Sequence, residues 1–359
     1  MEIIKTIINA LADPKILITV AAVLLFTSMR YPHKFYTNRV ALIVFGGMFL
    51  FLGLSFFDAN FKLIVTKPDN VPIVGMLFLL PFFTWFALRE AVRNDQRIAE
   101  GKPLTEQEET AEKVLTWPDL VYTELICMVV LTVVLIAWSI ALKAPIEEPA
   151  NPSNSPNPSK APWYFLGLQE MLVYFDPWLA GVVFPGLIVV GLMAIPYIDT
   201  NPKGNGYFTL KERKWEITTF LFGFLILWIL LVILGTFLRG PNWNFFGPYE
   251  FWDIHKLEAL VNVNLSEYIW VKALGMGLPR NPLVREFFGF VVVLAYLLAI
   301  PPLLAKTWFK EFYKTLGPPR FYVMTFLLLA MTALPIKMVL RWLFNLKYII
   351  GIPEYFFNI

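Results

Sequence analysis

Apolar residues along this chain gather into runs of about 20, the length that an α-helix needs to cross the hydrocarbon core of a membrane. Charged residues concentrate between the runs. The pattern predicts eight spanning helices, over 14–29, 38–57, 71–90, 119–143, 179–198, 215–238, 285–306 and 321–343. The first run lacks a small-x-small cleavage site, so we interpret it as a helix and not as a signal peptide. The predicted fold is an all-α, polytopic bundle of transmembrane helices.

Composition supports this fold class and narrows the chemistry. Hydrophobic residues make up 57% of the chain and charged residues 16%, against about 25% charged in a soluble domain. The net charge of +3 indicates no nucleic-acid partner. The single cysteine, Cys127, provides neither a covalent c-type haem motif nor the thiolates of an iron–sulfur cluster.

Only two histidines occur, and neither lies within a predicted helix. His33 follows a predicted helix end, and His255 lies in a long polar loop. A b-type haem usually needs two axial histidines that face each other across a helix bundle. We therefore expect this chain to ligate no haem and no metal, and we interpret both histidines as interfacial.

Lysine and arginine residues indicate the orientation of the helices. They crowd the connections after the first, third, fifth and seventh predicted helices: Arg30, Lys34, Arg39; Arg89, Arg93, Arg97; Lys203, Lys211, Arg213, Lys214; Lys306, Lys310, Lys314 and Arg320. Short loops rich in these residues stay in the cytoplasm. With eight helices, all four connections lie on that side of the cell's inner membrane, and both termini lie on the opposite, positive side.

The chain divides into five predicted segments. They are an N-terminal three-helix membrane segment (1–92), a polar cytoplasmic linker (93–116), a central domain (117–240), an interfacial loop on the positive side (241–284) and a C-terminal two-helix membrane segment (285–359). The central domain contains a loop, 144–178, that begins with the proline-rich stretch APIEEPANPSNSPNPSKAP. Such a stretch cannot lie in lipid, because its backbone polar groups would be unpaired.

Five landmarks in the central domain occur in a recognisable order. They are Trp117-Pro118-Asp119-Leu120-Val121-Tyr122, Glu148-Pro149-Ala150-Asn151-Pro152, Pro162-Trp163-Tyr164-Phe165, the run FPGLIVVGLMAIPYID, and Arg213-Lys214-Trp215. Over about residues 115–240 the chain resembles the C-terminal half of cytochrome b, known as the separate subunit IV of cytochrome bf complexes. In that family the Trp-Tyr motif lies on the positive side, which is the side that the basic residues predict.

The resemblance implies a subunit of a respiratory-chain quinol:cytochrome c oxidoreductase, inactive on its own. Its implied partners are a haem-bearing N-terminal cytochrome b subunit, a Rieske-type iron–sulfur protein and a c-type cytochrome, in a dimeric complex within membrane lipid. Quinol would bind at an interface between this chain and those subunits. The family uses this loop in its quinol-oxidation pocket, which implies quinol contacts at Pro162, Trp163, Tyr164, Phe165 and Leu166. Flat aromatic side chains can line an apolar slot, and the Tyr164 hydroxyl can donate or accept a hydrogen bond.

The motif departs from the family's best-known form, Pro-Glu-Trp-Tyr. Ala161 and Pro162 stand where that form has proline and glutamate. Because proline cannot accept a proton from quinol, the role of the glutamate is missing or has moved. Glu170, six residues after Tyr164 in a predicted short helix, is the candidate acceptor, since a partly buried carboxyl group suits a proton relay.

The other carboxylates of the loop have simpler interpretations. Asp176 precedes Pro177 and is a natural helix start as well as a weaker candidate acceptor. Glu147 and Glu148 have no histidine nearby, so a solvated loop or a docking surface for the iron–sulfur partner is favoured over a metal site.

Two other functions remain open from the sequence. A secondary transporter is disfavoured, because neither inverted repeats nor paired broken helices are apparent. A membrane anchor for another quinone-linked dehydrogenase, with the Trp-Tyr motif serving only structure, is the main alternative.

Overall fold

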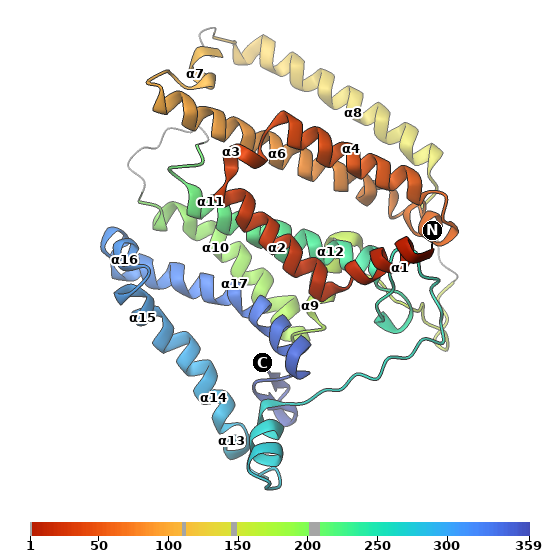
Figure 1. Cartoon of the computed structure of the whole chain (residues 1–359), viewed down its shortest axis with the longest axis vertical. Coiled ribbons are helices and arrows are strands. Elements are labelled where there is room, and N and C mark those ends of the chain that lie inside the picture. The colour runs from red at the N-terminus through yellow and green to blue at the C-terminus, as the bar shows by residue number, and fades with distance from the viewer. Residues whose placement is uncertain (1, 110–112, 145–148, 201–208) are drawn as a thin grey trace. The chain divides into compact units, whose positions relative to one another are not determined.

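The structure is a computed structural model that describes residues 2–109, 113–144, 149–200 and 209–359. Seven helical spans in these ranges are long and apolar enough to cross a membrane: Asn38–Ser55, Val71–Ala99, Thr116–Ala141, Leu179–Ile198, Lys214–Leu238, Phe287–Lys306 and Pro318–Phe344. The helices α1 (Glu2–Leu11) and α2 (Pro14–Arg30) meet at 72° and make an eighth span if the pair crosses as one. The predicted all-α, polytopic fold is confirmed, and every predicted helix has a counterpart (Figure 1).

The chain forms two compact units. Unit 1 comprises Met1–Ser159, Asn205–Phe222 and Thr236–Ile254, and unit 2 comprises Lys160–Gly204, Gly223–Gly235 and His255–Ile359. The helical span from Lys214 to Leu238 therefore contributes its first turns to unit 1 and its middle to unit 2.

Unit 1 contains the N-terminal helices. Its elements are α1 Glu2–Leu11, α2 Pro14–Arg30, α3 Pro32–Phe35, α4 Asn38–Ser55, α5 Ala59–Val65, α6 Val71–Ala99, α7 Thr105–Glu109, η1 Thr116–Leu120, α8 Val121–Ala141, α11 Lys214–Leu221 and η6 Pro241–Trp243. Side-chain caps fix several helix starts. The Asp13 carboxylate accepts from the backbone N–H of Lys15 at 2.9 Å, ahead of Pro14 at the first position of α2.

The long helices of unit 1 pack through aromatic side chains. Phe49 of α4 stacks on Phe78 of α6 with ring centroids 4.6 Å apart, and Phe45 lies 6.4 Å from Trp85 in an edge-on arrangement. By contrast, within the described residues no side chain of α8 is buried by the rest of the chain.

Polar contacts gather several connections of unit 1 at one end of its helices. The Lys5 ammonium lies 2.6 Å from the Asp58 carboxylate, so the N-terminus meets the connection between α4 and α6. The loop after the Lys214–Leu238 span joins them, because the Tyr249 backbone N–H donates to Asn9 at 3.0 Å. At the opposite end of α6, the Asp95 carboxylate accepts from the backbone N–H of Lys211 at 2.8 Å.

The proline-rich loop joins the first of these ends. The Asn157 side chain accepts from the backbone N–H of Asn242 at 2.7 Å and donates to the Asn242 side-chain oxygen at 3.0 Å. Because Asn242 and Tyr249 share one loop, the N-terminus and the proline-rich loop lie toward the same end of the helices of unit 1. At the other end, the contact between Asp95 and Lys211 joins two of the basic connections.

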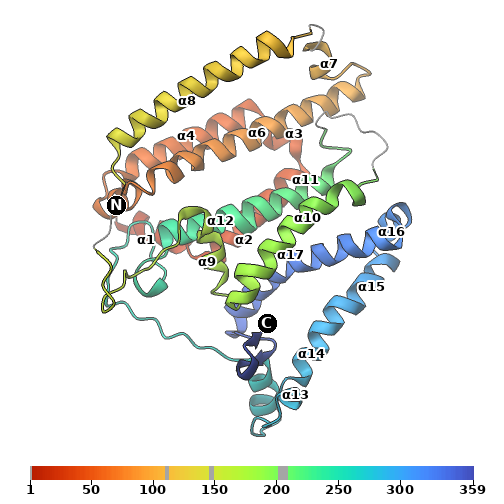
Figure 2. The ribbon, with the colours of Figure 1, turned by 180° about the vertical axis from the view of Figure 1, so that it is seen from behind.

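Unit 2 contains the Trp-Tyr motif and the C-terminal helices. Its elements are η2 Trp163–Phe165, α9 Leu166–Met171, η3 Leu179–Val183, α10 Phe184–Ile198, α12 Leu230–Ile233, η7 Glu267–Ala273, α13 Pro282–Arg285, α14 Phe287–Leu294, η8 Ala295–Ala299, α15 Ile300–Lys306, α16 Lys310–Leu316, α17 Pro318–Phe344, β1 Gly351–Ile352, η9 Pro353–Tyr355 and β2 Phe357–Asn358. The π-helical turns η4 Phe222–Ile229 and η5 Leu234–Leu238 flank α12 and continue into unit 1. Helices α10 and α17 pack side by side, and α16 folds back on α17 (Figure 2).

The C-terminal tail is tied to the start of the α14 helix. Strands β1 and β2 pair antiparallel, with Gly351 opposite Asn358. The Arg285 guanidinium holds the Glu354 carboxylate through two contacts of 3.0 and 2.9 Å. The buried carboxylate of Glu286 accepts from the Gly351 backbone N–H at 3.1 Å. This tail was not predicted from the sequence.

One helix is longer than the sequence pattern predicted. Helix α6 continues from the predicted end at residue 90 to Ala99, into the segment interpreted as a polar linker. Its 29 residues correspond to about 44 Å at 1.5 Å per residue, against a hydrocarbon core of about 30 Å. The charged turns after Leu88 therefore project beyond the apolar layer.

Candidate functional site

The Trp-Tyr motif forms a compact turn at the start of unit 2. A short 3-10 turn, η2, passes directly into α9. Gln169 stabilises the turn, because its side-chain oxygen accepts from the backbone N–H of Ala161 at 2.8 Å. The ring of Tyr164 lies 5.7 Å from that of Trp163 and 4.5 Å from that of Phe165. The motif thus presents three adjoining aromatic rings.

The predicted quinol contacts do not share one environment. Pro162, Tyr164 and Phe165 are exposed, Trp163 is half-buried and Leu166 is buried. The rings of Tyr164 and Phe165 are 48% and 49% exposed, which is enough to offer a flat apolar face to a ligand or another subunit. Leu166 instead packs inside unit 2.

Glu170 is fully buried, with 0% of its surface exposed. It lies on α9, whose other inward residues are Leu166, Gly167 and Met171. A carboxyl group at such a position is costly unless it is paired or functional. The sequence predicted partial burial for this residue, and the structure buries it completely.

Two glycines allow α9 to approach the span Lys214–Leu238 closely. A Cβ atom on Gly167 would lie 3.3 Å from the backbone oxygen of Trp228 and from a methyl group of Val232. A Cβ atom on Gly235 would lie 3.3 Å from the backbone oxygen and the Cβ of Leu166. The helix that carries Glu170 is therefore fixed by backbone-to-backbone contact.

The second half of the loop is held by the C-terminal tail. Asp176 immediately precedes the helical turn that begins at Pro177. Its carboxylate accepts from the Tyr348 hydroxyl at 3.0 Å and from the Asn358 amide at 3.4 Å. Trp178 donates through its indole N–H to the backbone oxygen of Asn358 at 3.0 Å. Burial, followed by the hydrogen bond to Asp176, raises the pKa of Tyr348 to about 12.

A lysine of α17 lies beside this cluster. Lys337 is 1% exposed, and its ammonium has no hydrogen-bond partner among the described residues. The ammonium faces aromatic rings, 5.5 Å from the centroid of Phe175 and 5.9 Å from that of Tyr348. Lys337 was not among the predicted site residues, although an ionisable residue within a predicted span is a recognisable signal.

The remaining candidates from the sequence are the pair Glu147 and Glu148 and the two histidines. Glu147 and Glu148 are outside the described residues. His33 lies in unit 1 and His255 in unit 2, and both are exposed. Over the described ranges, no three histidine, cysteine, aspartate or glutamate side chains are grouped to hold a metal ion.

The spans define a multi-pass membrane protein, and its site lies on a loop with an aromatic face and a buried carboxylate. Residues 149–249 match the family model described as cytochrome b (C-terminal)/b6/petD. The match covers rather more than a quarter of the chain, and its family is the one that the landmarks predicted. It begins at Pro149, so the landmark around Trp117 lies outside it. No solved structure matches the chain.

The match describes the segment that it covers. The family is that of the C-terminal part of cytochrome b, a component of membrane electron-transport complexes that partners the N-terminal part of cytochrome b. It is also associated with quinone binding. The matched residues include the Trp-Tyr motif and Glu170.

Proposed function

We propose that this chain is the haem-free, C-terminal cytochrome b subunit of a cytochrome bc-type complex and forms part of its quinol-oxidation site. In the proposed reaction, quinol becomes quinone and releases two electrons and two protons. One electron passes to a Rieske-type iron–sulfur protein and the other to a b-haem of the N-terminal cytochrome b subunit. Both protons leave on the positive side. A c-type cytochrome completes the proposed complex.

The observation that carries this proposal is the position of Glu170. It is buried on the helix that directly follows the aromatic turn, inside the segment matched by the family model. The exposed rings of Tyr164 and Phe165 provide an apolar wall, and a buried carboxylate provides a proton acceptor where the motif has proline in place of glutamate. The hydroxyl of Tyr164 is the second group proposed to contact a quinol oxygen.

Helix α8 offers a surface to the proposed haem-bearing subunit. Helix α8 is 21 residues long and contains no buried residue within the chain. The apolar composition of α8 suits contact with lipid. Because α8 lies just ahead of the matched segment in the chain, we favour a contact with the haem-bearing subunit. The proposed site would then lie between the two chains.

The replacement Glu170→Gln in the assembled complex tests the proposed proton acceptor. It keeps the size and the hydrogen-bonding capacity of the side chain but cannot take up a proton. We expect the rate of quinol oxidation to fall by about 100-fold, the lower end of the usual contribution of a general base. The rate should also lose much of its dependence on pH, measured as cytochrome c reduction from pH 5.5 to 9.

The matched control is Glu258→Gln, a change to an exposed glutamate in the loop before η7. It should leave both the rate and the pH profile unchanged. An unaltered profile in Glu170→Gln, with b-haem still present in the complex, would remove Glu170 from the mechanism. Purification with a molybdenum or nickel–iron subunit instead of b-haem would favour the dehydrogenase anchor.

A further inference from the structure

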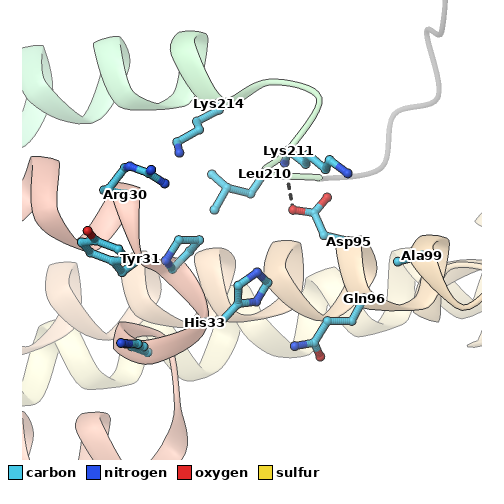
Figure 3. Close-up of a pocket in the computed structure, with 11 residues that line it drawn as sticks. Arg30, Tyr31, His33, Asp95, Gln96, Ala99, Leu210, Lys211 and Lys214 are labelled. Atoms are coloured by element: carbon cyan, nitrogen blue, oxygen red, sulfur yellow. Dashed lines mark hydrogen bonds between the residues drawn. The ribbon is translucent and has the colours of Figure 1, made fainter.

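A cavity of about 520 Å³ opens in unit 1 (Figure 3). It lies at the end marked by the contact of Asp95 with Lys211, away from the contact of Asn157 with Asn242. Four separate segments line it: the end of α2 with the turn before α3, the last turns of α6, the residues that precede α11, and the first residue of α11. The quinol loop contributes no residue to it. The cavity is therefore a second candidate site, built partly from N-terminal helices that lie outside the segment matched by the family model.

The lining of the cavity is strongly basic. Arg30, Lys34, Lys211 and Lys214 contribute four cations, against the single carboxylate of Asp95. Figure 3 shows the side chains of Arg30 and Lys214 extending into the same space from two different helices. Within the described part of the chain, none of these four cations forms an ion pair. Asp95 interacts electrostatically with Lys211, and the lining as a whole keeps a net positive charge.

Local contacts hold the cations in place without neutralising them. The ring of Tyr31 lies between two of them, 5.4 Å from the Arg30 guanidinium and 5.7 Å from the Lys34 ammonium. Such contacts attract a cation to the face of the ring but leave its charge intact. The Asp95 carboxylate is engaged by the backbone N–H of Lys211, which fixes the loop ahead of α11 against α6.

The position of the cavity favours a membrane lipid as the ligand. Arg30 ends α2 and Lys214 begins the span to Leu238, so the cations surround helix ends at one boundary of the apolar layer. Phosphate groups of lipids occupy that depth. A planar guanidinium binds a phosphate through paired hydrogen bonds, and ammonium groups add point charges. Basic pockets between transmembrane helices suit anionic headgroups.

We propose that this cavity, defined by Arg30, Lys34, Lys211 and Lys214, binds the phosphate group of an anionic phospholipid. The bound lipid would tie the end of α2, the end of α6 and the start of α11 together. This assignment is independent of the chemistry proposed for the quinol loop. A soluble phosphate could bind the same cations. The test therefore compares a phospholipid with inorganic phosphate.

The test uses the full chain, purified with the subunits that accompany it, and native mass spectrometry with added lipid. Phosphatidylglycerol should bind in preference to phosphatidylcholine. In the double variant Arg30→Gln/Lys214→Gln, we expect the Kd for phosphatidylglycerol to rise by about 25-fold, or about fivefold for each cation removed. The control Lys310→Gln/Arg320→Gln removes two exposed cations from the ends of α16 and α17 and should change the Kd little.

The proposal would be overturned if the double variant and the control Lys310→Gln/Arg320→Gln had the same Kd for phosphatidylglycerol. Equal affinity for the two lipids would also overturn it. Binding of inorganic phosphate that displaces phosphatidylglycerol at micromolar concentration would overturn the lipid assignment in favour of a soluble ligand. If the double variant fails to accumulate, the single change Lys34→Gln, at an exposed position, gives the same comparison with an expected rise of about fivefold.

Discussion

The carboxylates of the loop 144–178 show what can be predicted for single residues. Glu170 could be proposed from the sequence because it is an acidic residue close to an aromatic motif that lacks its own glutamate. The partners of Asp176 were not found, because Tyr348 lies 172 positions away along the chain. Hydrophobic periodicity reports which face of a helix is buried, but it carries no information about which distant side chain pairs with a carboxylate.

The bond between Tyr348 and Asp176 predicts a dependence of stability on pH. The pKa of Tyr348 is raised to about 12, first by burial and then by this bond, from an ordinary value of about 10. A group with a raised pKa stabilises the fold below its unfolded pKa and loses that contribution as pH rises through its folded pKa. The contribution should therefore be complete at pH 8 and disappear between about pH 10 and pH 12.

The variant Tyr348→Phe should unfold at a lower temperature than the wild type at pH 8, because it removes a hydrogen bond to a carboxylate worth about 1–2 kcal/mol. The difference should shrink as pH rises above about 10. Unfolding followed by tryptophan fluorescence in detergent measures both. Tyr355→Phe, a change to a tyrosine that is 76% exposed, is the control. A difference that persists unchanged to pH 12 would contradict the assignment.

At the level of elements, the close contact of α9 with the span Lys214–Leu238 determines where Glu170 lies. A methyl group on Gly235 would meet the backbone oxygen of Leu166 at 3.3 Å, and a backbone atom cannot swing away as a side-chain end can. Gly235→Ala should therefore destabilise the protein by about 1–2 kcal/mol, the cost of overpacking less the better helix propensity of alanine. Quinol oxidation should fall as well, because α9 would be displaced.

Gly46→Ala is the matched control for this prediction. Gly46 lies in α4, and a Cβ atom there would meet nothing within 4 Å. Its replacement should leave activity unchanged and raise stability slightly, by up to about 1 kcal/mol, through helix propensity alone. Thermal unfolding and cytochrome c reduction compare the two variants. Equal stability for Gly235→Ala and Gly46→Ala would show that the two helices do not constrain each other.

Helices were predictable from this sequence and the tail was not, for a physical reason. A span of about 20 apolar residues is a strong signal, because lipid offers the backbone no other hydrogen-bond partners. Strands β1 and β2 have two residues each, too few for an alternating pattern to be recognised. Their position depends instead on the bond between Arg285 and Glu354. The extension of α6 to Ala99 was missed because its last turns are polar and resemble a linker.

For the whole molecule, basic residues predict a topology, and contacts inside unit 1 group its connections at two ends of the helices. The N-terminus meets Asp58 through Lys5, and the loop of Tyr249 meets Asn9, at one end of the helices. Arg30 lies at the other end of α2, with Asp95 and Lys211. This arrangement favours a crossing by the bent pair α1 and α2, since the pair begins near Asp58 and ends near Asp95. The division into five segments stays a prediction.

Labelling of single cysteines in intact cells tests that topology. In a Cys127→Ser background, an impermeant thiol reagent should label Ser153→Cys in the proline-rich loop but should label Glu311→Cys only after the membrane is opened. Both positions are exposed. The decisive position is Glu2→Cys, whose side chain is 89% exposed. If α1 and α2 cross as one span, Glu2→Cys is labelled from outside together with Ser153→Cys.

A re-entrant pair would give the opposite result at the N-terminus alone. Glu2→Cys would then react only in opened membranes, like Glu311→Cys, and the chain would have seven spans. Labelling of Glu311→Cys from outside would instead reverse the whole orientation and place the quinol loop on the cytoplasmic side. That outcome would contradict release of quinol protons on the positive side, because Ser153 shares the loop that leads into the Trp163–Phe165 turn.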